Sequence, residues 1–103
     1  MNVPPLHFPG TGPSLAEEGV ELFQNSPNPF IEMTQLRFRL SGATEVVVRL
    51  FDAKGQEVTT KKGNYAPGEH HLVLHRADLR EAGLHTCRLE TLFGTVSRKL
   101  MMY

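Results

Sequence analysis

Two stretches of the sequence alternate apolar and polar residues with a period of two, and this alternation restricts the fold more than any other feature. The stretches are Thr34–Leu40 and Glu45–Phe51. Because successive side chains of a β-strand point to opposite faces of a sheet, each stretch is predicted to be a strand with one buried face. The residues expected to point inward are Leu36, Phe38 and Leu40 in the first strand and Val46, Val48 and Leu50 in the second.

Turn-forming residues divide the rest of the chain into further short runs. Additional strands are predicted at Leu22–Gln24, Gln56–Lys61, His70–His75, Leu84–Thr91 and Val96–Met102. In the last two strands the residues expected to face the core are His85, Cys87 and Leu89, and Val96, Leu100 and Met102. About seven short strands without a long helix predict an all-β fold, an immunoglobulin-like antiparallel β-sandwich.

The connections between these strands carry recognisable turn chemistry. Asp52–Gly55 is predicted to be a tight turn, in which the aspartate accepts hydrogen bonds from the backbone and the glycine takes a positive φ. Gly63–Gly68 is expected to be a loop, and Asp78–Glu81 one capped helical turn that stops at Gly83. Gln56–Lys61 has few apolar residues and is therefore predicted to lie at a sheet edge.

A bend rich in proline and asparagine follows the first strand, within the stretch LFQNSPNPF at Leu22–Phe30. Pro27 and Pro29 lack an amide hydrogen, so neither can lie inside a paired strand, and the strand is expected to end near Asn25. Each proline also disfavours the helical region for the residue before it. We expect an extended bend, after which Phe30 fills one end of the core.

The first 19 residues differ in composition from the rest. They contain four prolines and three glycines and no periodic apolar face. Residues 1–19 are therefore predicted to be a linker, with at most one helical turn that begins at Ser14 and ends at Gly19. Residues 20–103 are predicted to form one folded domain.

Charge and hydropathy exclude several classes of protein. The 103 residues carry a formal net charge of zero, whereas a nucleic-acid-binding protein needs a basic excess to contact phosphates. No apolar run approaches the roughly 20 residues that span a bilayer, so no transmembrane segment is expected. The first residues also lack the pattern of an export signal. If the protein is exported, we expect that signal on a larger precursor, upstream of this chain.

The residues that often carry chemistry do not assemble into a predicted active site. Cys87 is the single cysteine of the chain and is expected to be a small apolar residue of a strand. His70 and His71 point to opposite faces of their strand, and His71 and His75 are about 13 Å apart along it, too far to share one metal ion. His85 is expected to be a hydrogen-bonded, partly buried imidazole. The sequence therefore predicts neither an enzyme nor a cofactor or metal site.

Three arginines have outward positions on neighbouring predicted strands. Arg37, Arg39 and Arg49 would form a positive stripe if these strands paired with each other. The preferred interpretation is a solvated sheet face, on which acidic residues balance the arginines. The acidic residues expected to balance them are Glu32, Glu45 and Glu57.

The order of the motifs resembles a known family, the C-terminal sorting domains of the type IX secretion system of Bacteroidota. The bend and the alternating strand after it resemble the start of these domains. The later motifs are a valine-rich strand with its turn (Val46 to Gly55), a glycine–histidine strand (Pro67 to Leu74), the strand of Leu79, Gly83, Leu84, His85, Cys87, Arg88 and Leu89, and the closing Arg98 to Met102. The chain departs from the family at His85 and Cys87, where tyrosines are usual, and at Tyr103, where lysine is usual.

The resemblance implies an address domain without catalytic activity. Its family members travel behind a secreted cargo, fold in the periplasm and are recognised by the outer-membrane secretion machinery. A sortase-like peptidase then commonly cuts in the linker and attaches the cargo to the cell surface. For this chain the expected partners are therefore an upstream cargo domain in the same precursor, that machinery and that peptidase. The expected location is the periplasm in transit, then the cell surface or the medium.

Two sets of residues follow from the resemblance and from position in the chain. The terminal strand is the hypothetical recognition element, because a strand at a sheet edge offers backbone groups to a partner. Its residues are Arg98, Lys99, Leu100, Met101, Met102 and Tyr103. The structural residues of the family motifs are Pro27, Asn28, Pro29, Phe30, Asp52, Gly55, Gly68 and Gly83.

Two other interpretations remain open at this point. One is a carbohydrate-binding accessory module of an extracellular enzyme, although such modules stack sugars on aromatic rings and the chain has no Trp and two Tyr. The other is a purely structural module, similar to the immunoglobulin-like part of flagellar hook-capping proteins.

Overall fold

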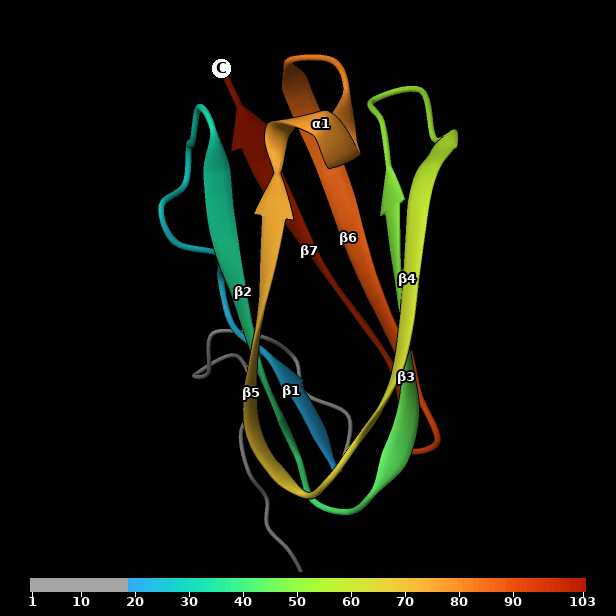
Figure 1. The fold of residues 1–103 in the computed structure, drawn as a ribbon. Helices are drawn as coiled ribbons and strands as arrows, with labels where there is room; N and C mark the ends of the chain where they lie inside the picture. The colour runs from blue at the N-terminus through green and yellow to red at the C-terminus, as the bar shows by residue number, and fades with distance from the viewer. Residues whose placement is uncertain (1–18) are drawn as a thin grey trace, which may run out of the picture.

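The computed structural model describes residues 19–103, which fold into two antiparallel β-sheets that face each other (Figure 1). The strands and the helix of this part are β1 (Val20–Leu22), β2 (Met33–Leu40), β3 (Thr44–Phe51), β4 (Glu57–Tyr65), β5 (Gly68–His75), α1 (Arg76–Leu79), β6 (Gly83–Thr91) and β7 (Gly94–Met102). The prediction of an all-β sandwich of about seven strands is confirmed. The predicted linker lies outside the described residues, except for Gly19.

The two sheets contain three and four of the described strands. The three-stranded sheet has the order β1-β2-β5, and the four-stranded sheet has the order β4-β3-β6-β7. In the immunoglobulin constant-type sandwich the fourth strand belongs to the sheet of the first two. Here β4 pairs with β3 in the other sheet, and both β4 and β7 are edge strands. The predicted edge position of the strand that carries Lys61 is therefore confirmed.

The core lies between the sheets and consists of the residues that the alternation selected. Along β2 the burial alternates without interruption, and Thr34 joins the predicted inward residues. The fully buried or nearly buried core side chains from the predicted positions are Leu36, Phe38, Leu40, Val46, Val48, Leu50, Cys87, Leu89, Val96, Leu100 and Met102, with His85 among the buried polar residues. Phe30 is 2% exposed, so its predicted place at one end of the core is also confirmed.

The first strand begins and ends two residues earlier than predicted. Val20–Leu22 pairs with β2, and Val20 lies opposite Leu40. The chain nevertheless stays beside β2 beyond β1, since Phe23 donates its N–H to Arg37 O at 2.9 Å. Ser26 then exchanges two backbone hydrogen bonds with Gln35, at 3.1 and 2.9 Å. The contact with β2 thus continues until the first proline of the bend.

The predicted loop at Gly63–Gly68 is wrong, because β4 continues through it to Tyr65 and β5 already begins at Gly68. The Tyr65 ring explains this extension. Its centroid lies 5.3 Å from that of Phe38 and 4.9 Å from that of His70, in edge-to-face arrangements. These contacts at the margin of the core stabilise the end of β4, and Ala66 and Pro67 alone make the turn.

The predicted helical turn at Asp78–Glu81 is displaced towards the N-terminus. Helix α1 spans Arg76–Leu79, its N-cap is His75, and Asp78 is the third helical residue of a capping box instead of the predicted N-cap. The Asp78 carboxylate accepts the N–H of His75 at 2.9 Å, which satisfies a backbone donor at the start of the turn. Arg80 then leaves the helix with a φ of 70°. Within residues 19–103 no helix has the length and apolar character needed to cross a membrane.

The hairpin of β6 and β7 offers a matched test of this core. Leu89 is completely buried, whereas Leu92 at the tip is 80% exposed. Leu89→Ala should lower the free energy of unfolding by about 2–5 kcal/mol, because it removes buried methyl groups and leaves a cavity. Leu92→Ala should change it by less than about 0.5 kcal/mol. Denaturant titration measures both values, and equal effects of the two substitutions would contradict the assignment of the inner face.

Candidate functional site

The proline-rich bend lies against the end of the terminal strand β7, at the end of the sandwich where the chain finishes (Figure 1). Phe30 pairs with Met102 in a parallel β-bridge. The Phe30 N–H donates to Met101 O at 3.1 Å, and the Tyr103 N–H donates to Phe30 O at 2.9 Å. The first and the last motif of the chain thus form one structural unit.

Side chains of the same bend bind further backbone groups of β7. The Asn28 side-chain oxygen accepts the N–H of Met101 at 2.9 Å, and the Gln24 amide donates to Lys99 O at 2.9 Å. Because backbone groups of an antiparallel edge strand alternate in direction, Thr95, Ser97, Lys99 and Met101 present theirs away from β6. The hypothesis of a terminal strand with open backbone groups therefore needs correction. The bend already binds the N–H and the C=O of Met101 and the C=O of Lys99.

A buried network of side-chain hydrogen bonds stabilises the bend. Asn25 is 3% exposed, and its amide donates to Thr34 Oγ1 at 2.9 Å and to Pro27 O at 3.1 Å. The Thr34 hydroxyl donates to the same Pro27 oxygen at 2.7 Å, and Gln24 donates to Asn25 Oδ1 at 2.7 Å. The asparagine before the prolines and the threonine after them thus supply the hydrogen bonds that this backbone cannot make in a sheet.

Arg76 binds the last residue of the chain and the loop after the bend through hydrogen bonds. One guanidinium nitrogen, Nη1, donates to Ile31 O at 2.8 Å and to Tyr103 O at 2.6 Å. The Arg76 backbone N–H also donates to Glu32 O at 2.8 Å. The loop after the bend, helix α1 and the final residue are therefore tied together. No local pattern predicted this role, because Arg76 is 45 and 27 positions from its two partners along the chain.

The six hypothetical recognition residues divide into two sets according to the face of β7. Leu100 and Met102 are buried, and Arg98 also points inward, where its Nε donates to Leu22 O at 3.2 Å. The other three residues, Lys99, Met101 and Tyr103, point outward; Lys99 is exposed, Met101 is half-buried and Tyr103 is 66% exposed. Only the outward set is available to a partner that contacts the folded domain.

A groove on the outer face of the four-stranded sheet begins beside Lys99. Its volume is about 360 Å³, and its walls come from β3, β6, β7 and the turn after β3. The lining residues are Phe51, Asp52, Ala53, Gly55, Leu84, Thr86, Arg88, Ser97 and Lys99. The turn at Asp52–Gly55 was predicted for its local geometry alone, and the structure shows that it also forms one wall of a groove.

The Asp52–Gly55 turn has the predicted chemistry. Asp52 Oδ1 accepts the backbone N–H groups of Gln56 and Lys54, both at 2.9 Å, and these bonds hold the pKa of the carboxyl below its usual value. Gly55 has a φ of +87°. Gly68 and Gly83 also have positive φ and lie at the first positions of β5 and β6. The structure places these motif residues at turns and strand starts, not in a shared site.

Within residues 19–103 the histidines and the cysteine do not meet in one cluster. His70 faces the rings of Phe38 and Tyr65, whereas His71 lies on the outer face, 3.4 Å from Glu69. His85 is buried, and its ring nitrogens face the carbonyl oxygens of Gly83 and Leu79 at 3.0 and 3.3 Å. Among residues 19–103 no group of three or more potential metal ligands is brought together.

The three arginines that could have formed a positive stripe do not lie together. Arg37 and Arg39 lie on β2 and Arg49 lies on β3, which belong to different sheets, so they occupy opposite outer faces of the sandwich. Arg37 and Arg39 pair with Glu69 and Glu21 at 3.1 and 3.3 Å. The preferred interpretation of a balanced face holds, although of Glu32, Glu45 and Glu57 only Glu57 forms an ion pair with one of these arginines.

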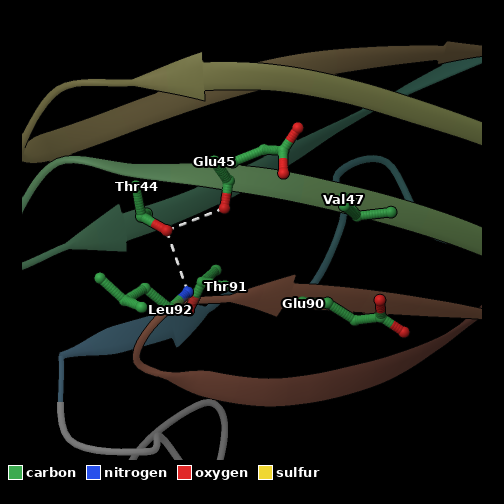
Figure 2. Close-up of a pocket in the computed structure, with 6 residues that line it drawn as sticks. All are labelled: Thr44, Glu45, Val47, Glu90, Thr91 and Leu92. Carbon is green, nitrogen blue, oxygen red and sulfur yellow. Dashed lines mark hydrogen bonds between the residues drawn. The ribbon is translucent and has the colours of Figure 1, made fainter.

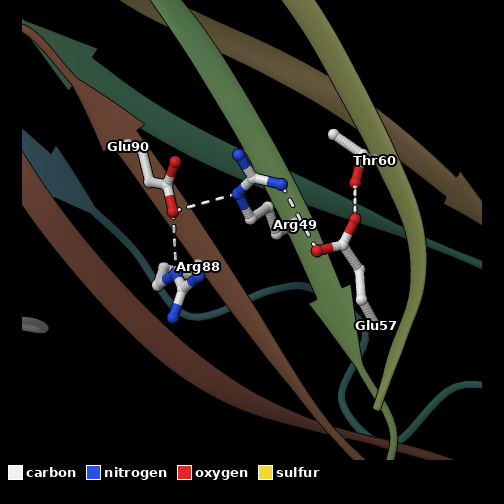
Figure 3. A network of polar contacts seen from close by, with 5 residues as sticks. All are labelled: Arg49, Glu57, Thr60, Arg88 and Glu90. Carbon is white, nitrogen blue, oxygen red and sulfur yellow. Dashed lines mark hydrogen bonds and ion pairs between the residues drawn. The ribbon is translucent and has the colours of Figure 1, made fainter.

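Arg49 is the centre of a network on the outer face of the four-stranded sheet (Figure 3). It contacts Glu90 at 3.0 Å and Glu57 at 3.3 Å, and Arg88 contacts Glu90 at 2.9 Å. The hydrogen bond and charge of Glu90 raise the pKa of Arg49. The pKa of Glu57 is lowered mainly by the hydrogen bond from the Thr60 hydroxyl, and also by the hydrogen bond and the charge of Arg49. The charges of this face are thus mostly neutralised within the domain.

A second groove lies at the opposite end of the same face (Figure 2). Thr44 connects its two sides, because its hydroxyl donates to Glu45 O at 2.8 Å and accepts the N–H of Leu92 at 2.9 Å. The groove is remote from the terminal residues of β7, near the tip of the β6–β7 hairpin. We assign it no role in recognition.

Comparison with known proteins adds little to this description. The chain matches no protein-family model and no curated protein. It is similar to a solved structure of a β-glucosidase from Listeria innocua in complex with glucose, with 17% sequence identity and a TM-score of 0.47. That match covers 81% of this chain and 16% of the β-glucosidase chain. A similarity of this degree supports no conclusion about fold or activity.

The network under the bend predicts an effect on stability. Asn25→Ala should lower the free energy of unfolding by about 1–3 kcal/mol, because it leaves buried polar groups of Thr34 and Pro27 with fewer partners. Asn64→Ala, at an exposed position of β4, should change it by less than about 0.5 kcal/mol. Thermal or chemical denaturation provides both values. A loss at position 25 no larger than the loss at position 64 would mean that the network does not hold the bend.

Cys87 should be inert while the protein is folded. Burial raises the pKa of its thiol to about 12, so at pH 8 about one molecule in ten thousand carries the reactive thiolate. We expect no alkylation by iodoacetamide at pH 8 within an hour, and complete alkylation after unfolding in guanidinium chloride. Mass spectrometry distinguishes the two states, and rapid modification of the folded protein would show that Cys87 is accessible.

Proposed function

We propose that this chain is a non-catalytic sorting domain, which directs an upstream cargo through the outer membrane by the type IX secretion system. In this proposal residues 20–103 form the folded signal, and residues 1–19 form the linker in which a sortase-like peptidase cuts. The cargo then remains at the cell surface. The domain itself acts by being recognised, so it needs a stable surface and no reactive group.

One observation carries the proposal: the two ends of the motif series meet at one corner of the domain. The bend that starts the resemblance binds the strand that ends it, through Phe30, Asn28 and Gln24. If the outer-membrane machinery reads the terminal strand, this contact presents the strand in one fixed conformation. The family-type bend then has a physical purpose in recognition.

The aromatic residues favour this proposal over a carbohydrate-binding module. Tyr65 is half-buried and lies against Phe38 and His70, so its ring is engaged within the domain. Of the two tyrosines of the chain, Tyr103 has the exposed side chain. A single exposed tyrosine does not make the flat aromatic platform on which sugars stack.

The experiment that tests the proposal is a secretion assay. The 103-residue chain is fused behind a periplasmic reporter enzyme with its own export signal, and the fusion is expressed in a bacterium with an active type IX system. We expect the wild-type fusion in the medium or on the cell surface. Lys99→Glu and Tyr103→Ala should each reduce its secretion by at least about fivefold, as expected for an interface residue worth about 1 kcal/mol.

The matched controls change similar side chains elsewhere on the surface. Lys62→Glu alters an exposed lysine of the opposite edge strand, and Leu92→Ala alters an exposed apolar residue. Both should be secreted normally. Point substitutions replace deletion of residues 98–103, because deletion would also remove the buried Leu100 and Met102. Retention of the wild-type fusion in the periplasm of secretion-competent cells would refute the proposed function.

A further inference from the structure

We propose that the groove beside β7 is the surface through which the domain binds its partner, and that it accepts an extended acidic segment of a protein with a neighbouring apolar side chain. This inference deepens the proposed function and rests on it for the identity of the partner. It extends recognition from the outward side chains at the end of the chain to the adjacent outer face of the four-stranded sheet.

The shape of the groove favours a polypeptide segment. Its base is a row of outward side chains on three adjacent strands: Phe51 on β3, Thr86 on β6 and Lys99 on β7. Leu84 is 41% exposed and extends the base towards the end of the domain where the chain finishes. The turn that contains Ala53 lines the groove beside this row. A volume of about 360 Å³ on an open face accommodates a few side chains of an extended segment.

The charge of the groove determines the kind of segment. Asp52 directs its carboxylate to the backbone N–H groups of its own turn, and Arg88 is paired with Glu90. The Arg88 guanidinium also lies 4.7 Å from the centre of the Phe51 ring. The Lys99 ammonium, in contrast, takes part in none of the ion pairs within residues 19–103, and Lys99 is exposed. A partner carboxylate beside Lys99 therefore completes the electrostatics of the groove.

The apolar residues determine the second requirement. The exposed Leu84, the half-buried Phe51 and Ala53 together offer an apolar contact for an aliphatic or aromatic side chain of the partner. Thr86 lies between Phe51 and Lys99, and Ser97 lies two positions before Lys99 on β7, opposite Arg88. Both hydroxyl groups line the groove and are suited to hydrogen bonds with a peptide backbone. Nucleic acid is not favoured as the partner, because the 103-residue chain carries no basic excess for phosphate contacts.

A binding experiment tests the groove without any secretion machinery. The probe is a synthetic peptide with blocked ends that alternates phenylalanine and aspartate, and its control has lysine in place of aspartate. NMR titration of the ¹⁵N-labelled 103-residue chain should show shifts at the amides of Leu84, Thr86 and Lys99 with the acidic peptide. The basic peptide should cause none. Shifts elsewhere, or none at millimolar peptide, would overturn the inference.

Substitutions locate the binding surface. Leu84→Glu and Lys99→Glu should each weaken binding of the acidic peptide by at least about tenfold. Leu92→Glu and Lys62→Glu, which make the same chemical changes outside the groove, should not weaken it. The dispersion of the NMR spectrum verifies that each variant is folded, and Leu84→Ser replaces Leu84→Glu if the latter is not. Equal binding by the groove variants and their controls would refute the assignment.

The secretion assay separates this inference from the proposed function. Leu84 lies in the groove but outside β7, whereas Tyr103 directly follows β7 and does not line the groove. Reduced secretion of Leu84→Glu supports the groove. Normal secretion of Leu84→Glu together with secretion of the wild-type fusion would overturn the groove and leave the sorting function intact. A dimer of the chain that Leu84→Glu disrupts would also overturn it, since the occupant would then be a second copy.

Discussion

The hydrogen bonds between Phe30 and the end of β7 are the contact on which the arrangement of this domain depends. They connect the segment that enters the three-stranded sheet with the last strand of the four-stranded sheet. Apolar packing, which is the main interaction between facing sheets, has no direction. Hydrogen bonds to Met101 and Tyr103 fix the position of one sheet edge relative to the other. Prolines in the preceding bend remove competing strand pairing, so this segment remains available for β7.

The strands and their buried faces were predictable because both are local properties of the sequence. A period of two identifies a strand and its inner face without knowledge of its neighbours. Burial of Phe38, Leu50 and Leu89 follows from that pattern alone. The length of β4 was not predictable in this way, since it depends on contacts of Tyr65 with Phe38 and His70, which come from other strands.

The candidate site required information that no local pattern contains. The sequence indicated the terminal strand, but not which of its backbone groups the bend occupies, because Asn28 and Met101 are 73 positions apart. The arrangement of the outward arginines could not be decided from the sequence for a related reason. Alternation shows that Arg39 and Arg49 point outward, but it does not show that their strands belong to different sheets. Pairing of strands is decided by packing of the whole chain.

The alternation along β7 also limits how a partner can read this strand. Leu100 and Met102 are part of the core, so the fold itself determines which side chains they can have. A folded domain offers Lys99, Met101 and Tyr103 instead, and the groove places Thr86 and Leu84 of the neighbouring strand beside them. Specificity in such an arrangement comes from a surface of two strands. Under the proposed function, a short terminal sequence would be necessary for recognition without being sufficient, because the adjacent strand must be folded beside it.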